Sequence, residues 1–194
     1  MVTFTLDTNC LIDVAHDRPS AVHVRTLADA HASSKADVAI VAMSASERQP
    51  DHKYLSNYRE FADWVASLGL SHLRTLLPLA FADVTFFDAC VMGGPELIKR
   101  DREIGLAMFP AIEVDWVRFA NARGIDIEDV SSQPGRRWRN ALCDRQMFWA
   151  HDHNQRDIFV TSNVKDFLRL NKHPAFPSAR VVTPDEAVRI MQAT

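Results

Sequence analysis

The sequence TFTLDTNCLID, residues 3–13, decides the fold, because a short apolar run stops at an aspartate and is followed at once by a helical pattern. Residues 2–6 carry no charge and consist mainly of β-branched and aromatic side chains, as expected of a strand buried on both faces. Asp7 ends this strand, and residues 9–14 can form a helix. A buried strand followed directly by a helix is the first part of a parallel α/β unit.

The same alternation of strands and helices continues along the chain. Strands that alternate with helices predict a parallel sheet covered by helices, and such sheets bind ligands at the carboxyl ends of their strands. Further strands are expected at residues 37–43, 81–92, 158–161 and 180–183. Helices are expected at residues 19–32, from Glu47 onward, and at 57–68, 95–108, 111–122, 140–151, 165–170 and 185–191.

Length and composition restrict the class of protein. The chain has 194 residues, of which 47% are hydrophobic and 24% charged, as in an ordinary globular domain. We expect a single domain over residues 1–194, with residues 51–133 as an extended, mainly helical insertion. The formal net charge of −3 excludes a positive potential over the whole protein. Any binding of a nucleic acid must therefore come from a local patch of basic residues.

Cysteine usage and hydropathy indicate a compartment. Cys10, Cys90 and Cys143 are odd in number, form no C-x-x-C motif and lie in apolar stretches, so we expect reduced, buried thiols in a cytoplasmic protein. The first residues, MVTFTLD, have neither the basic nor the long apolar part of a signal peptide. No stretch reaches 18 uncharged apolar residues, so no membrane-spanning helix is expected.

Four acidic residues stand where a parallel sheet would collect them. Asp7 ends the first strand, Glu47 follows the second, Asp144 lies on the helix before the strand at residues 158–161, and Asp166 lies just past that strand. Carboxylates that converge repel one another, so such a cluster favours bound divalent cations. Oxygen ligands with open water positions suit Mg²⁺ or Mn²⁺, which can activate a water for attack on a phosphate.

Three segments together resemble PIN domains. TFTLDTNCLID resembles the opening of that family, a strand followed by Asp-Thr-Asn and a helix. MSASE, residues 43–47, resembles its second acidic element. ALCDRQMFWAHDHNQRDIFVTSNVKDF, residues 141–167, resembles its closing signature, an acid on a helix, a strand, and then T-x-N-x-x-D-F. The first and last motifs are fairly specific in combination, and the matched stretches cover roughly half of the chain.

The resemblance implies a Rossmann-like sheet sandwiched by helices and a ribonuclease activity that depends on Mg²⁺ or Mn²⁺. Many family members are toxins of bacterial toxin–antitoxin modules, so the partners it implies are an RNA substrate, an antitoxin protein and a second copy of the chain. Residues 51–133 form a longer connection than the compact toxins carry. The implied metal ligands are Asp7, Glu47, Asp144 and Asp166, supported by Asn9, Thr161 and Asn163.

The densest basic cluster is PGRRWRN, residues 134–140. Arg136, Arg137 and Arg139 surround Trp138 just before the Asp144 helix, where they could hold phosphates while the indole stacks on a base. The alternative is an ordinary solvated loop with a half-buried tryptophan. Arg48 and Lys165 adjoin the proposed ligands and could contact the scissile phosphate.

Each acid also has a purely structural interpretation. Asp7 could cap the helix that follows it, and Asp144 could pair with Arg139 or Arg145. Asp51 could take the place of Glu47. Asp166 could cap the next turn, with Asn163 as the nearer metal contact, and Asp13 is expected to be solvated.

Two other functions compete with a ribonuclease. FTLDTN and IFVTSN resemble motifs of haloacid-dehalogenase-type phosphatases, but Asn9 stands where their second aspartate would act as general acid. The IFVTSN strand also comes too late in the chain to leave room for the remaining phosphatase motifs. The second alternative is a catalytically silent PIN-like module that only binds RNA or protein, a reading that the loss of acidic residues would favour. All four acids are present.

Overall fold

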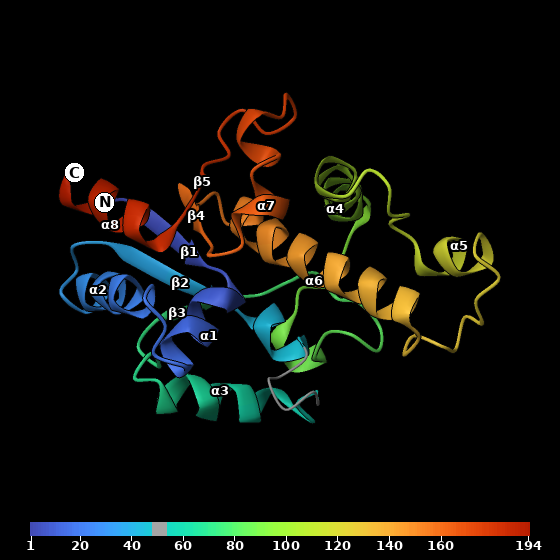
Figure 1. Ribbon diagram of the computed structural model, residues 1–194, viewed down its shortest axis with the longest axis horizontal. Helices are drawn as coiled ribbons and strands as arrows, with labels where there is room; N and C mark the ends of the chain where they lie inside the picture. Colours follow the sequence, from blue (N-terminus) through green and yellow to red (C-terminus); the bar gives the residue numbers. More distant parts are fainter. Residues whose placement is uncertain (48–53) are drawn as a thin grey trace.

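A parallel sheet of five strands, in the order β3-β2-β1-β4-β5, forms the centre of the protein (Figure 1). The computed structural model describes residues 1–47 and 54–194. Every neighbouring pair of strands runs parallel, so the predicted α/β fold with a parallel sheet between helices is confirmed. The strands are β1 (Thr3–Leu6), β2 (Asp37–Val41), β3 (Arg74–Leu76), β4 (Ile158–Val160) and β5 (Val181–Val182).

Helices cover both faces of this sheet (Figure 1). One face packs against α1 (Thr8–Ala15), α2 (Ala21–Ala32), α3 (Tyr58–Ser67) and α8 (Pro184–Gln192). The other packs against α4 (Pro95–Met108), α6 (Gln133–His153) and α7 (Val164–Phe167), while α5 (Trp116–Asn121) lies against the start of α6. Short 3-10 helices complete the chain: η1 (Ala42–Ser46), η2 (Phe87–Ala89) and η3 (Leu170–Lys172). None of the helices in this described part is long and apolar enough to cross a membrane.

The central strands are mainly apolar because both of their faces are buried. Phe4 and Leu6 of β1 point into the core on the α1 side, whereas Thr5 between them faces α6, where its hydroxyl lies 3.0 Å from the Nδ1 of His151. Phe159 of β4 packs on the α6 side, against the ring of Phe148. This alternation follows from the two-residue repeat of a strand.

The order of the strands creates a crevice between β1 and β4. From β1 the sheet grows through β2 to β3, and the chain then crosses to the other side of β1 to add β4 and β5. The connections therefore leave β1 and β4 in opposite directions, which is the arrangement in which parallel sheets bind ligands. The Asp7 amide donates to the Val160 carbonyl at 2.9 Å, so the two strands stay together up to this edge.

The middle of the chain differs from expectation in three places. Residues 81–92 form turns and η2 instead of a strand, and a single bridge joins Leu79 to Val91. Their apolar side chains do not share one face, since Phe86 packs on the α1-side core and Phe87 is 70% exposed. The strand of this region is β3, which the sequence did not reveal because it has only three residues and lies at the edge of the sheet. The helix expected at 111–122 is confined to α5.

A further difference is the start of α6. Residues 134–140 are not a loop but the first two turns of this helix, because Ser132 caps it by accepting from the Gly135 amide at 3.2 Å and Pro134 stands in its first turn. A Cβ at Gly135 would lie 2.5 Å from the Val130 carbonyl oxygen, so only glycine allows this close approach. The helix expected from Glu47 falls on residues 48–53, outside the described residues.

The buried side chain of Arg156 links the amino ends of β1 and β2 through hydrogen bonds. The guanidinium of Arg156 donates to the Phe4 carbonyl at 2.9 Å, to the Asp37 carbonyl at 2.7 Å and to Asp37 Oδ2 at 3.0 Å. The hydrogen bond from Arg156 holds the pKa of Asp37 below its usual value. Stability from this lowered pKa is fully present above about pH 3.9 and is lost as the pH falls through the folded-state value.

We expect Arg156→Met to lower the free energy of unfolding at pH 7 by about 2 kcal/mol, because the carbonyls and the Asp37 carboxylate lose a charged donor. The variant should also lose less stability than the wild type on acidification below about pH 4. Urea unfolding at both pH values measures this, with the exposed Arg25→Met as control. A variant that behaves like Arg25→Met would contradict the role given to Arg156.

Candidate active site

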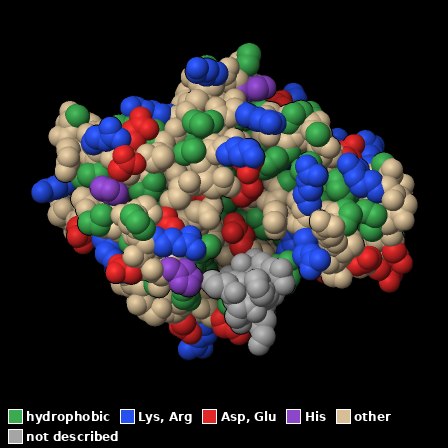
Figure 2. Space-filling model, in the orientation of Figure 1, with side chains coloured by type: hydrophobic (Ala, Val, Ile, Leu, Met, Phe, Trp, Pro, Cys, Tyr) green, Lys and Arg blue, Asp and Glu red, His purple; other side chains and the backbone are tan. Residues whose placement is uncertain are grey.

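The four predicted acids lie at the carboxyl edge of the sheet, around the crevice between β1 and β4. Asp7 directly follows β1, Glu47 follows η1 at the end of β2, Asp144 lies on α6, and Asp166 lies on α7 after β4. Glu47, Asp144 and Asp166 line one cleft of about 380 Å³. Asp7 is 1% exposed and lies behind this cleft. Figure 2 shows acidic side chains gathered in a hollow near the centre of the molecule.

Asp7 is held by donors from two elements. Its Oδ1 accepts from the Thr8 amide at 2.8 Å, as in a helix cap. Its Oδ2 accepts from the Asn9 amide group at 2.9 Å and from the Thr161 hydroxyl at 2.7 Å. Asp7 thus caps α1 and also belongs to the acidic group. The two interpretations of Asp7, as a helix cap and as a site residue, are therefore compatible. Asn9 and Thr161 lie in the supporting positions expected of them.

Glu47 is tied to the start of α1. The Thr8 hydroxyl donates to Glu47 Oε1 at 2.9 Å and lies 2.8 Å from the Ser44 hydroxyl oxygen. These contacts join the end of β2 to the end of β1, so Thr8 belongs to the site, although only its place in the Asp-Thr-Asn motif hints at this. Asp51, the other candidate for this position, lies outside the described residues.

Asp144 makes no ion pair with any residue that the structure describes. Arg145 pairs with Asp101, Nε to Oδ1 at 2.8 Å. Arg139 donates to the carbonyls of Ser46 and Asp83, at 3.1 and 3.3 Å. Both arginines that could have neutralised Asp144 are therefore engaged elsewhere, and its charge is exposed to the other acids of the cleft.

The acids interact strongly with one another. Burial raises the pKa of Asp7, against hydrogen bonds from Thr161 and Asn9 that lower it. Burial and the charges of Asp7 and Asp144 raise the pKa of Glu47 well above its usual value. Burial and the charges of Asp7 and Asp166 likewise raise the pKa of Asp144 well above its usual value. Four segments far apart in the sequence thus form one electrostatic unit, of the kind that clusters at functional sites.

The loop after β4 completes the site. The Thr161 hydroxyl, which donates to Asp7, accepts from the Asn163 amide at 2.9 Å. Asn163 Nδ2 lies 3.4 Å from Asp166 Oδ2, so the loop also orients the fourth acid. Asp13, expected to be solvated, is in fact 3% exposed and accepts from Ser162, which ties α1 to this loop.

Several cleft residues escaped the sequence analysis. Tyr54, Asn140 and Cys143 line the cleft beside the acids. Asn140 lies four residues before Asp144 and four after Arg136, so the helical period would have placed all three on one face of α6 had that helix been predicted to start early enough. The thiols of Cys10 and Cys143 are buried as expected, which raises their pKa well above the usual value, while Cys90 is only half-buried.

The predicted RNA-binding residues fall into different environments. Arg136 lines the cleft and is exposed, as are Arg137 and Lys165. Trp138 is 8% exposed, packs in the core between α5 and α6 and donates to the Glu113 carbonyl, so stacking a base on it as expected would need a change of conformation. Arg139 is half-buried over the Tyr54 ring. Arg48 lies outside the described residues.

The chemistry of the cleft fits a hard divalent cation. Its donors are carboxylate oxygens, and burial together with the charges of neighbouring acids raises the pKa of Glu47 and of Asp144. Over residues 1–47 and 54–194, no three His, Cys, Asp or Glu side chains are arranged to hold a metal ion together. Mg²⁺ needs only one or two carboxylates, since water and substrate phosphate supply its remaining ligands. A pair of these acids is therefore a sufficient donor set.

Comparison of the sequence with models of known protein families finds no match, and neither does comparison with curated proteins. The function of the chain is therefore inferred from the residues of the cleft.

We expect the metal-free Asp144→Asn variant to be at least as stable as the wild type. Two unit charges about 5 Å apart at an effective dielectric near 20 repel by about 3 kcal/mol, which sets the upper limit of the gain. The same variant should lose most of the stabilisation that Mn²⁺ gives the wild type, because a cation that binds the folded state raises its stability. Thermal melts with EDTA and with Mn²⁺ measure both effects. A less stable variant with the wild-type response to Mn²⁺ would remove Asp144 from the site.

Proposed function

We propose that this protein is a metal-dependent ribonuclease of the PIN type. The observation that supports it best is the gathering of Asp7, Glu47, Asp144 and Asp166 at the crevice of the sheet, with no arginine or lysine among the described residues paired to Asp144. A group of mutually repelling carboxylates around a cleft favours bound Mg²⁺ or Mn²⁺.

The residues in and around the cleft have two proposed roles, to bind the cation and to position the residues that bind it. A pair drawn from Asp7, Glu47, Asp144 and Asp166 would hold the cation, with the other two acids close by. When bound, the cation would polarise a phosphate and lower the pKa of an attacking water. Thr161 and Asn9 fix the carboxylate of Asp7, and Thr8 fixes that of Glu47. These hydrogen bonds reduce the freedom of the ligands before substrate arrives, which lowers the cost of ordering them during the reaction.

The proposed substrate is single-stranded or loop RNA, cut internally to leave a 5′-phosphate and a 3′-hydroxyl, as in the family that the chain resembles. Arg136 lines the cleft, and we expect it to contact a phosphate next to the one that is cut. The resemblance extends the proposal to an antitoxin protein and to a second copy of the chain as partners. A small reading frame beside that of this protein would be the first sign of an antitoxin.

We expect the protein to cleave RNA with Mg²⁺ or Mn²⁺ and to be inactive in excess EDTA. Asp7→Asn and Asp144→Asn should each abolish cleavage, whereas Asp63→Asn, an exposed acid of α3, should leave it unchanged. Gel analysis of end-labelled RNA measures the activity and the product ends. Full activity in EDTA would overturn the proposal. Hydrolysis of small phosphomonoesters instead of RNA would favour a phosphatase of the haloacid-dehalogenase type. RNA binding without cleavage would favour a catalytically silent PIN-like module.

The basic residues of α6 should separate into two groups. Arg136→Ala and Arg137→Ala should each weaken RNA binding and reduce the slope of log affinity against log salt by about 0.7, because each removes one phosphate contact. Arg139→Ala should leave the slope unchanged and lower the melting temperature, because this side chain is engaged with the carbonyls of Ser46 and Asp83. Binding curves at several salt concentrations decide between these outcomes. Equal slopes for all three variants and the wild type would show that these arginines belong to an ordinary solvated surface and do not bind RNA.

A further inference from the structure

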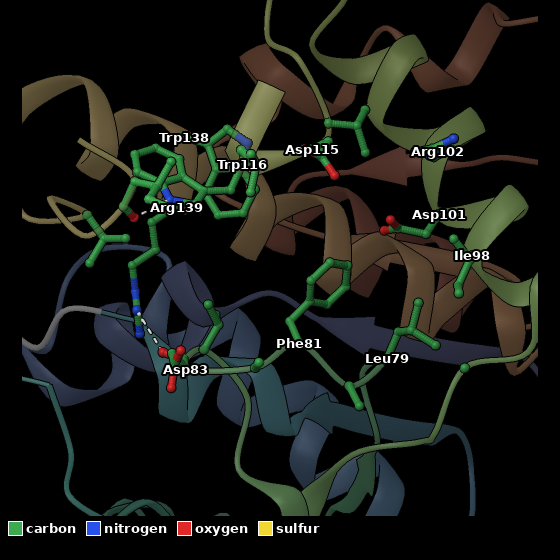
Figure 3. Close-up of a pocket in the computed structure, with 18 of the residues that line it drawn as sticks. Leu79, Phe81, Asp83, Ile98, Asp101, Arg102, Asp115, Trp116, Trp138 and Arg139 are labelled. Carbon is green, nitrogen blue, oxygen red and sulfur yellow. Dashed lines mark hydrogen bonds between the residues drawn. The ribbon is translucent and has the colours of Figure 1, made fainter. Parts of the chain in front are cut away.

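A second hollow, larger than the acidic cleft, lies on the other side of α6. It is a groove of about 570 Å³ between α4, α5, the first turns of α6 and the chain at residues 79–84 (Figure 3). Phe81, Trp116 and Trp138 contribute aromatic rings to its wall. Around its rim stand large apolar side chains that are 47–75% exposed: Met92, Ile98, Val117, Ile127 and Val130. A groove of this size and apolar character is typical of small-molecule sites.

One nearly inaccessible carboxylate, Asp101, lines this mainly apolar groove, whose other charged lining residues are Asp83, Arg102, Asp115 and Arg139. Asp101 is 2% exposed, and its Oδ1 lies 2.8 Å from Arg145 Nε and accepts from Gln146 Nε2 at 2.5 Å. Its Oδ2 accepts no hydrogen bond from any described residue. Gln146 in turn accepts from the Leu79 amide at 2.9 Å, so the carboxylate is held in one orientation by the groove wall itself. A carboxylate fixed through one oxygen, at the wall of a groove, can accept a hydrogen bond from a ligand through the other oxygen.

These features define the chemistry of a ligand. Aromatic walls favour a flat ring, and the free oxygen of Asp101 favours an N–H donor on the edge of that ring. We propose that the groove binds a purine base, with an N–H group donating to Asp101 Oδ2 and the ring lying against Phe81 and Trp116. Purines offer a larger face than pyrimidines to these walls, so they gain more from burial.

The groove and the acidic cleft share one helix. Trp138 of the groove and Asp144 of the cleft are six residues apart on α6, which is about 9 Å along the helix axis. Arg139 lines the groove while it donates to the carbonyl of Ser46, the residue before Glu47. A base held in the groove could therefore belong to an RNA strand whose phosphate lies in the cleft. This source of the purine rests on the proposed function, whereas the pocket itself does not.

In the competing interpretation, the contacts of Asp101 with Arg145 and Gln146 only hold α4 against α6, and the groove binds no ligand. Variants of Asp101 cannot separate the two interpretations, because they leave Arg145 buried without its partner. The ligand can be changed instead. Adenosine carries an exocyclic amino group, whereas purine riboside keeps the same ring without any N–H donor. Uridine keeps a donor but has a smaller ring.

The test measures quenching of tryptophan fluorescence by these nucleosides, since Trp116 and Trp138 lie in the groove. We expect saturable quenching by adenosine. The affinity for purine riboside should be lower by about tenfold or more, the loss expected when a hydrogen bond to a charged group is removed. Uridine should also bind more weakly than adenosine, because its smaller ring buries less area against the aromatic walls. Ile98→Tyr, which narrows the rim, should abolish the adenosine effect. Leu106→Tyr, an exposed position on the same helix outside the groove, should not. Absent quenching, equal affinity for adenosine and purine riboside, or an unaffected Ile98→Tyr would overturn the proposal.

RNA oligomers then identify the source of the purine. Oligouridylate with one internal adenosine should bind the catalytically inactive Asp144→Asn protein more tightly than oligouridylate alone, and Ile98→Tyr should remove the difference. If free adenosine binds but the internal adenosine adds nothing, the pocket serves a free nucleotide. Quenching by adenosine in a protein that cuts no RNA would support the purine pocket and contradict the ribonuclease proposal. Cleavage of RNA without quenching would support the ribonuclease proposal and contradict the purine pocket.

Discussion

The hydrogen bond from the Thr161 hydroxyl to the Asp7 carboxylate joins the two strands at which the sheet changes its direction of growth. Asp7 is almost fully buried, and a carboxylate in that position is stable only if donors surround it. Its donors come from the first turn of α1 and from the end of β4, so satisfying this one group fixes where both connections begin. The crevice, the loop that carries Asn163 and the position of Glu47 against Thr8 all depend on that arrangement.

The helix α6 serves both sides of the region that we propose to be functional. Its apolar positions fill the core against β4, while Asp144 lines the cleft and Trp138 lines the groove. The same helix carries Arg145 and Gln146 to the buried carboxylate of Asp101. Because a helix is rigid over this length, groups on its two faces keep a constant separation.

The acidic edge of the sheet could be predicted because it depends on local signals. Asp7 and Asp166 adjoin short uncharged strands, Asp144 interrupts an apolar helix face, and parallel sheets bring such strand ends together. The middle of the chain could not be predicted in the same way. Residues 81–92 have the composition of a strand, but their apolar side chains are divided between separate clusters and solvent, which depends on contacts with distant elements. The early start of α6 was hidden by Gly135, a residue that usually ends helices and here is required by the Val130 carbonyl.

The buried chain of contacts from Leu79 through Gln146 to Asp101 and Arg145 also bears on how the protein unfolds. Two of these residues belong to the long middle segment and two to the helix that carries Asp144. If the middle segment came loose, Arg145 and Gln146 would be left in an apolar interior without partners, and opening one part would therefore destabilise the other. The enlarged middle is for this reason not an appendage that could be trimmed away, and the whole chain should melt as one cooperative unit.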